Sequence, residues 1–210
     1  MNFDNFRPIG LLSIAYRIIS KAISNRIQPA LQKIIGSHQF AYLHGRRAEN
    51  ISRIVFEMML QSLLDPNPEV ITLKLDFKKA FDSISFQYIR CILENINIPQ
   101  IMLDLIMSMM CNLNGAIIIN NGHSSSFPIL RGTTQGSALS AIIFILCLEG
   151  LCKIASENPS IFGAIPLSDL NLLVALLAFA DDMIVFTYLM YISRWLSLLS
   201  QWGPVFWCDS

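Results

Sequence analysis

Residues 172–188, with the sequence LLVALLAFADDMIVFTY, carry the most informative pattern in the chain. Two apolar runs have the composition of core strands, and Ala180-Asp181-Asp182 separates them as the tip of a predicted hairpin. Neighbouring side chains of a strand point to opposite faces, so the two aspartates can share a ligand only where a turn bends the chain. The two runs are Leu172 to Phe179 and Met183 to Tyr188.

A further strand is predicted at Val70 to Asp76, because apolar and polar residues alternate along it. If the strands that end at Asp76 and Asp181 lie side by side, their carboxylates converge, and such oxygen ligands suit Mg²⁺ or Mn²⁺. Two ions about 4 Å apart can activate a hydroxyl and stabilise a departing phosphate. The alternative is an ordinary hairpin turn, in which aspartate is common. Asp82 is interpreted as a cap or turn residue.

The rest of the chain indicates an α+β fold, with strands and intervening helices packed on one sheet. Helical spacing of apolar residues predicts four helices, and Pro29 is expected to break or kink the first. The helices are expected at about Ser13–Lys33, Ala48–Leu64, from Ser83 or Ser85 to Ile96, and from Pro99 to Met110. A hairpin is predicted around Asn121-Gly122, with Pro128 on an edge strand, then a helix from Ser137 to about Ser156 and a loop over Asn158–Asn171.

Composition raises the possibility of a membrane protein, since 53% of the residues are hydrophobic and 14% are charged. A spanning helix needs roughly 20 mainly apolar residues. The richest runs are too short, because Glu149 interrupts one and Asp181 ends the other, so we expect no membrane contact. Five cysteines without a Cys-x-x-Cys pair indicate neither disulfides nor zinc, and the absence of a signal-peptide pattern predicts an intracellular protein.

Charge is distributed unevenly, although the net charge is zero. Residues 1–53 contain eight Lys/Arg and two Asp/Glu, a balance of +6, and the remainder carries −6. A basic lobe beside an acidic one suits a protein that contacts phosphates with one part and holds metal with another. The alternative is that these cations only solvate helix surfaces. Asp65-Pro66-Asn67-Pro68 is the predicted boundary between the two parts.

Several strings resemble the reverse transcriptase domain of non-LTR (LINE-type) retrotransposons, and they occur in that family's order. They are Phe6-Arg7-Pro8-Ile9, the stretch from Ile18 to Arg26, Leu75 to Asp82 (LDFKKAFD), Arg131 to Ser140 (RGTTQGSALS) and Phe179-Ala180-Asp181-Asp182. The resemblance covers about residues 3–188. It implies a polymerase right hand truncated to fingers and palm, with an antiparallel palm sheet packed on helices and the thumb absent. The expected parts are a fingers-like basic lobe at 1–68, a palm at 69–188 and a divergent tail at 189–210.

The resemblance also implies roles for individual residues. Asp76 and Asp181 would hold two Mg²⁺ (or Mn²⁺) ions, with Asp182 supporting them. Phe81 would stand against the sugar 2′ position, and Arg7 would contact the triphosphate. Gln135 and Gly136 would contact the nascent pair and the template. For Phe81 the alternative is a plain core residue, and for Arg7 a surface ion pair.

The expected activity is RNA-directed DNA polymerisation, with an RNA template, a DNA primer and dNTPs as partners. The resemblance implies a nuclear or cytoplasmic location. Ser137-Ala138 stand where the family usually has Asp-Pro, and Thr133-Thr134 replace an apolar-basic pair. An alternative is therefore a catalytically inactive retrotransposon-derived fragment with at most weak nucleic-acid binding. A maturase of a mobile intron shares the palm arrangement, but the strings resemble it less.

Overall fold

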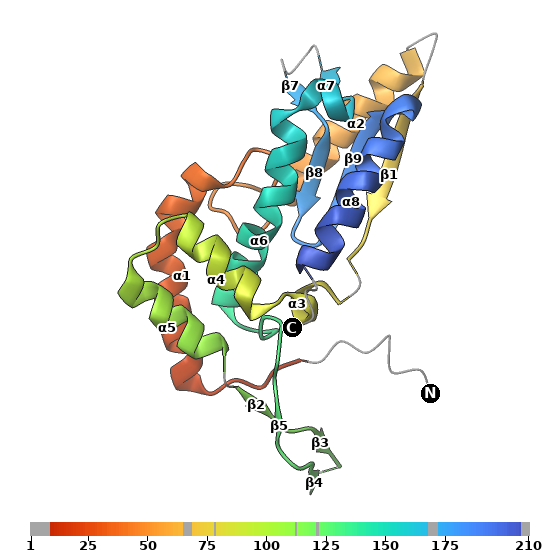
Figure 1. Cartoon of the computed structure of the whole chain (residues 1–210). Coiled ribbons are helices and arrows are strands. Elements are labelled where there is room, and N and C mark those ends of the chain that lie inside the picture. Colours follow the sequence, from red (N-terminus) through yellow and green to blue (C-terminus); the bar gives the residue numbers. More distant parts are fainter. Residues whose placement is uncertain are drawn as a thin grey trace.

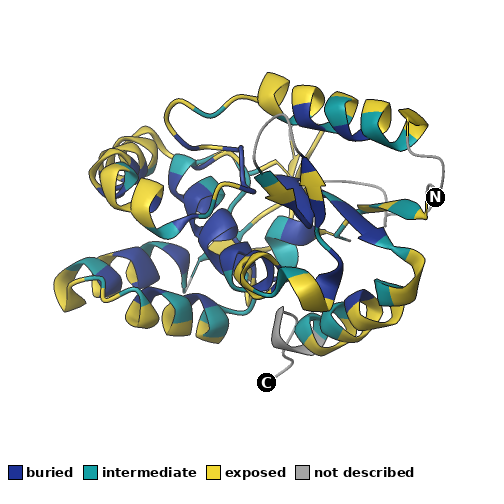
Figure 2. Ribbon diagram, turned by 90° about the horizontal axis from the view of Figure 1, so that it is seen from above, coloured by how far each residue is buried: buried dark blue, intermediate teal, exposed yellow. Residues whose placement is uncertain are grey.

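The computed structural model describes residues 9–64, 69–77, 79–111, 113–120, 122–167 and 172–206, with side chains as far as Gly203. A central helix, α6 (Ala138–Glu157), lies between a group of helices and an antiparallel sheet (Figure 1). Buried residues gather along this helix and the strands, and the outer faces of the surrounding helices are exposed (Figure 2). The predicted α+β class is confirmed.

The main sheet has three antiparallel strands in the order β1-β9-β8. They are β1 (Val70–Leu75), β8 (Leu176–Phe179) and β9 (Asp182–Tyr188). Side chains alternate along β9, so that Met183 and Val185 join the core around α6 while Ile184 and Phe186 join a second cluster on the other face. The strand prediction at Val70 to Asp76 is confirmed, with Asp76 directly after the last paired residue.

Two predictions in this region were wrong. The apolar run from Leu172 to Phe179 is not one strand, because the chain bends at Ala175. The first part, β7 (Leu172–Val174), pairs instead with β6 (Ile165–Leu167). The expected loop over 158–171 therefore holds β6 and the short helix α7 (Pro159–Phe162), in which proline occupies a first-turn position that needs no N–H donor.

Helices cover both faces of the sheet, as Figures 1 and 2 show. On one face, α2 (Ala48–Leu64) packs through Ile54 and Met58 onto the second cluster. On the other face lie α6 and the C-terminal helix α8 (Ile192–Phe206). The remaining large helices pack against α6 and each other: α1 (Ile14–Ile34), α4 (Phe86–Asn95) and α5 (Gln100–Met110). These bounds confirm the predicted helices.

The first helix continues through Pro29, so of the two predicted outcomes, a break or a kink, the break does not occur. Proline removes one backbone donor, yet α1 has a buried face formed by Ile23, Ile27 and Leu31. Burial of these side chains in the main core holds the helix on both sides of the proline.

The N-terminus of α6 is capped from another helix. Ser137 occupies the N-cap position, as predicted, but its hydroxyl makes no cap hydrogen bond. It lies 2.7 Å from the Ser20 hydroxyl of α1, and that hydroxyl accepts from the Leu139 N–H at 3.2 Å. A buried serine of α1 thus satisfies one of the free N–H groups of α6 and ties the two helices together.

Among the described residues, α6 is the one helix long and apolar enough to cross a membrane. The expectation that this apolar run is too short to span a membrane was therefore wrong, but the helix is mostly buried inside the fold, as in a core helix. Glu149, within this helix, is 7% exposed and is stabilised by His38 at 3.0 Å and by the Gly36 N–H at 3.0 Å. A buried acidic side chain is tolerated here because it is hydrogen bonded.

Residues 189–206 form a short 3-10 turn, η3 (Leu189–Tyr191), followed by α8. Trp195 of α8 is fully buried and donates its indole N–H to the Phe162 carbonyl at 3.0 Å. Trp202 packs edge-on against Tyr88 of α4. The segment expected as a divergent tail therefore packs, as far as it is described, into the main core.

The four described cysteines differ in burial. Cys147 and Cys152 are buried in the core, where burial raises the pKa of both thiols. Cys91 is exposed, whereas Cys111 is half-buried and packs against the core. All four are free thiols, and Cys208 lies outside the described residues.

Candidate polymerase active site

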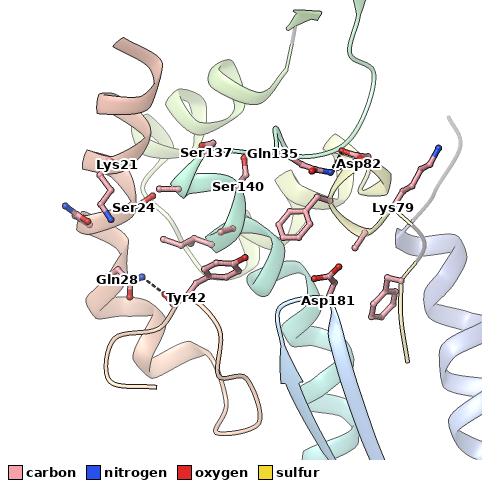
Figure 3. Close-up of a pocket in the computed structure, with 18 of the residues that line it drawn as sticks. Lys21, Ser24, Gln28, Tyr42, Lys79, Asp82, Gln135, Ser137, Ser140 and Asp181 are labelled. Carbon is pink, nitrogen blue, oxygen red and sulfur yellow. Dashed lines mark hydrogen bonds between the residues drawn. The ribbon is translucent and has the colours of Figure 1, made fainter. Parts of the chain in front are cut away.

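Asp76 and Asp181 reach the same cavity from different strands. Leu75 pairs with Met183 and Phe179 pairs with Asp182, so the end of β1 and the β8–β9 turn lie at one end of the sheet. The strands that end at these aspartates are not neighbours, because β9 lies between them. Both aspartates nevertheless line a cavity of about 900 Å³, into which Asp181 projects from the hairpin tip (Figure 3).

Asp182 is placed differently from Asp181. It is the first residue of β9, and its carboxylate lies 3.7 Å from the Lys74 ammonium on the neighbouring strand. Both side chains are largely exposed, and Asp182 is not among the residues that line the cavity. The structure thus brings together two of the three predicted aspartates.

Phe81 forms part of the cavity wall and part of the core. It belongs to α3 (Ala80–Ser83), the short helix that follows the Asp76 segment. Its ring stacks on Phe144 of α6 with 4.4 Å between centroids, while the residue also lines the cavity. Both interpretations from the sequence, a wall against the substrate sugar and a core residue, are compatible with this position.

Gln135 and Asp82 interact across the cavity wall. The Gln135 amide nitrogen donates to both carboxylate oxygens of Asp82, at 3.1 and 3.2 Å, and both residues line the cavity (Figure 3). The interpretation of Asp82 as a cap or turn residue missed this contact, because the sequence does not show which side chain faces the turn. The amide of Gln135 is held in one orientation by this contact.

The segment around Gln135 is fastened to α3 by backbone contacts. The Gly132 N–H donates to the Ile84 carbonyl at 2.7 Å, and the Thr133 N–H donates to the Phe81 carbonyl at 2.6 Å. Gly132 has φ +90°, and a Cβ there would lie 2.7 Å from the Asp82 Cα. Glycine is required at this position because backbone approaches backbone. Gly136, with φ +98°, lines the cavity as well.

Helix α1 and the loop after it form the opposite wall, which sequence reasoning missed. Lys21, Asn25 and Gln28 line the cavity from one face of α1, and their spacing of three to four residues was the available signal. Tyr42 lines it from the loop, where Gln28 donates to its carbonyl at 2.7 Å (Figure 3). Burial, and then the charge of Asp181, raise the pKa of the Tyr42 phenol.

Asp76 and Asp181 suit a Mg²⁺ site in which the substrate supplies further ligands to the ion. Among the described residues no group of three or more His, Cys, Asp or Glu could hold a metal ion by itself. Mg²⁺ is commonly bound by one or two carboxylates together with water and substrate phosphates, and two are what Asp76 and Asp181 supply. Arg7, predicted to contact the triphosphate, lies outside the described residues.

An antiparallel sheet with two aspartates lining a cavity at one end of it is the arrangement expected of a polymerase palm. Residues 2–193 match the family described as "Reverse transcriptase (RNA-dependent DNA polymerase)". The chain therefore belongs to the reverse transcriptase family, whose members generally use divalent metal ions.

Several relatives are proteins of non-LTR retrotransposons. The chain is 28% identical over 86% of its length to the transposon TX1 uncharacterized 149 kDa protein of Xenopus laevis. It is 24% identical over 88% of its length to a Pol polyprotein of the retrotransposable element R2 of Popillia japonica. It spans 14% and 25% of those two proteins.

Solved structures support the same fold. The telomerase of Candida albicans, determined with a fragment of telomeric RNA, matches with a TM-score of 0.56 and 13% identity. The match covers 88% of this chain and 32% of the telomerase chain. Apo telomerase of Candida tropicalis, truncated from its C-terminal domain, gives a TM-score of 0.55 over 89% of this chain. The fingers-and-palm fold is thus confirmed, whereas the boundaries at residues 68 and 188 remain predictions.

Proposed function

We propose that this chain is the fingers-and-palm part of an enzyme that adds deoxynucleotides to a DNA primer on an RNA template. The observation that carries the proposal is that Asp76 and Asp181, far apart in sequence, line one cavity together with Phe81 and Gln135. Two carboxylates at one end of a sheet suit divalent ions that contact phosphate oxygens. Family membership supports nucleic acid as the partner.

In this proposal each residue has a defined task. Asp76 and Asp181 hold two Mg²⁺ or Mn²⁺ ions, which lower the pKa of an attacking hydroxyl and stabilise the charge of a departing phosphate. Phe81, held by Phe144, limits the space beside the nucleotide sugar. Gln135, oriented by Asp82, presents its amide oxygen to the nucleotide or the template. Arg7 contacts the triphosphate, and Asp182 supports the metal residues through the hairpin.

Lys21 on α1 adds a cation to the same cavity, where it faces the phosphates of a bound nucleotide or strand. RNA, a DNA primer and dNTPs are the proposed partners. The proposed location is inside the cell, in the nucleus or cytoplasm where such templates occur.

The test is Mg²⁺-dependent extension of a DNA primer on an RNA template by residues 1–210, beside an Asp181→Ala variant. Extension by the original chain that the variant loses would support the proposal. Circular dichroism of both proteins establishes that they are folded. A folded chain that extends no primer at saturating Mg²⁺ would instead identify an inactive retrotransposon-derived fragment.

A further inference from the structure

Gln39 is a buried glutamine outside the cavity that contacts the hairpin carrying Asp181. It lies in the loop after α1 and is 1% exposed. Its side-chain oxygen accepts from the Ala180 N–H at 3.0 Å and from the Ala41 N–H at 3.0 Å. Ala180 directly precedes Asp181, so this one oxygen links the loop after α1 to the tip of the catalytic hairpin.

Ala180 is a residue that needs such support. Its φ is +56°, in the left-handed region, where a residue with a Cβ costs about 1–2 kcal/mol. It is buried, and the strand pairing ends at Phe179 and Asp182, so the sheet itself leaves the Ala180 N–H to another acceptor. The Gln39 oxygen satisfies this N–H and holds the turn in the conformation that directs Asp181 to the cavity.

The backbone around Gln39 is fixed against the same strand. The Ala178 N–H donates to the His38 carbonyl at 2.7 Å, and the Phe40 N–H donates to the Ala178 carbonyl at 2.9 Å. These bonds extend the sheet by a short parallel bridge beside β8. Arg46 donates to the Gln39 carbonyl at 2.6 Å, which anchors the loop from its other side. Gln39 therefore reaches Ala180 from a rigid base.

The contacts of its oxygen, and not of its nitrogen, determine where the Gln39 amide lies. Within the part of the chain that the structure describes, its buried NH₂ group has no hydrogen-bond partner. Leaving a buried donor unpaired costs about 1–3 kcal/mol, which burial of an apolar side chain would avoid. The polar side chain at this position is explained by the two hydrogen bonds that its oxygen accepts from backbone N–H groups.

We infer that Gln39 is a positioning residue of the active site, which sets the direction of Asp181 through the Ala180 turn. The inference rests on the proposed function, since it assumes that Asp181 binds metal. The same loop continues to Tyr42, whose phenol faces Asp181 in the cavity. Gln39 thus fixes the relative position of the hairpin and the loop wall, two parts that the sequence separates by well over a hundred residues.

The experiment uses Gln39→Met, which keeps the side-chain length but removes the acceptor, and Gln39→Glu, which restores an acceptor oxygen. Gln61→Met is the matched control, because Gln61 of α2 donates to the Pro166 carbonyl away from the cavity. Mn²⁺ binding to the full chain is titrated by electron paramagnetic resonance. Amide exchange of Ala180 is followed by NMR on protein labelled with ¹⁵N-alanine, without metal.

We expect Gln39→Met to lose Ala180 protection and to bind Mn²⁺ about 10-fold more weakly, as loss of a group supporting a metal ligand does. Gln39→Glu should recover most of the Ala180 protection and most of the Mn²⁺ affinity. Gln61→Met should match the original chain in both measurements. If Gln39→Met unfolds, Gln39→Asn replaces it, since the shorter amide cannot reach both N–H groups.

Unchanged Ala180 exchange in the folded Gln39→Met variant overturns the inference. So does unchanged Mn²⁺ affinity where Asp181→Asn weakens binding, an outcome that leaves the proposed function intact. By contrast, an original chain whose Mn²⁺ binding does not depend on Asp181 overturns the proposed function, and Ala180 exchange still decides whether Gln39 holds the hairpin.

Discussion

Asp181 and Asp182 are neighbours in sequence but occupy opposite sides of one hairpin. Asp181 faces a cavity that α1, α3 and α6 enclose. Asp182 faces outward, 3.7 Å from Lys74, and both of these side chains are largely exposed. The turn at Ala180 separates them, because the ladder resumes at Asp182 and sets its side chain by the alternation of β9.

Both positions carry a carboxylate, but they differ in burial and in the hydrogen bonds that support the surrounding backbone. The cavity side is held by buried hydrogen bonds from α1, the loop after it and the segment at Gly132. The outer side has an exposed ion pair, which solvent screens. Substitutions on the cavity side should therefore reduce activity or stability more than substitutions on the outer side.

The largest contrast is expected between Asp181→Asn and Asp182→Asn. Loss of a metal ligand removes several kcal/mol of transition-state stabilisation, so Asp181→Asn should reduce primer extension by at least about 100-fold. Asp182→Asn should reduce it by about 10-fold, as expected for a group that supports metal ligands. Single-turnover primer extension at several Mg²⁺ concentrations measures both. Equal losses would show that Asp182 also binds the ions.

The next largest effect is expected at Gly132. An alanine Cβ would meet the Asp82 backbone at 2.7–2.9 Å in a left-handed conformation, so Gly132→Ala should lower the free energy of unfolding by about 2 kcal/mol or more. Gly45→Ala is the control, because φ is +79° there but no atom lies within 4 Å of the Cβ. Gly45→Ala should lower the free energy of unfolding by about 1 kcal/mol. Urea unfolding followed by circular dichroism compares the two, and similar losses would contradict close packing at Gly132.

Much of the fold could be predicted because its signals are local. Apolar periodicity gives α2 from Ala48 to Leu64, and alternation gives β1 and the position of Asp76 after it. The Asp-Asp tip between two apolar runs gives the hairpin and one carboxylate of the site. Each of these features depends on residues a few positions apart, which a sequence displays directly.

The features that could not be predicted depend on partners distant in the chain. The pairing of Gln135 with Asp82, the cap that Ser20 provides and the support of Ala180 by Gln39 each join separate segments. The persistence of α1 through Pro29 has the same origin, since tertiary burial outweighs the local loss of one hydrogen bond. No pattern of spacing within one segment identifies such contacts.

A smaller effect is expected at the junction of α1 and α6, which forms part of the cavity wall. Ser20→Ala removes the acceptor of the Leu139 N–H and the partner of the Ser137 hydroxyl, and should lower the free energy of unfolding by about 1 kcal/mol. Ser13→Ala removes an exposed cap, whose hydroxyl accepts from the Tyr16 N–H at 3.2 Å, and should cost about 0.5 kcal/mol. Urea unfolding of both variants measures the difference. A larger loss at Ser13 would show that the hydroxyl pair does not stabilise the junction.

The smallest effect is expected for the ion pair on the outer side of the hairpin. Lys74→Ala and Asp182→Asn, combined in a double-mutant cycle, should give a coupling free energy of about 0.5 kcal/mol or less, because exposed pairs gain little in water. The coupling should fall further when the urea titrations are repeated at 1 M NaCl, where charges are screened within about 3 Å. A coupling well above 1 kcal/mol that salt does not reduce would mean that Asp182 is held as firmly as Asp181. In that case the two sides of the hairpin would differ in direction but not in rigidity, and Asp182 would be able to fix the turn from outside.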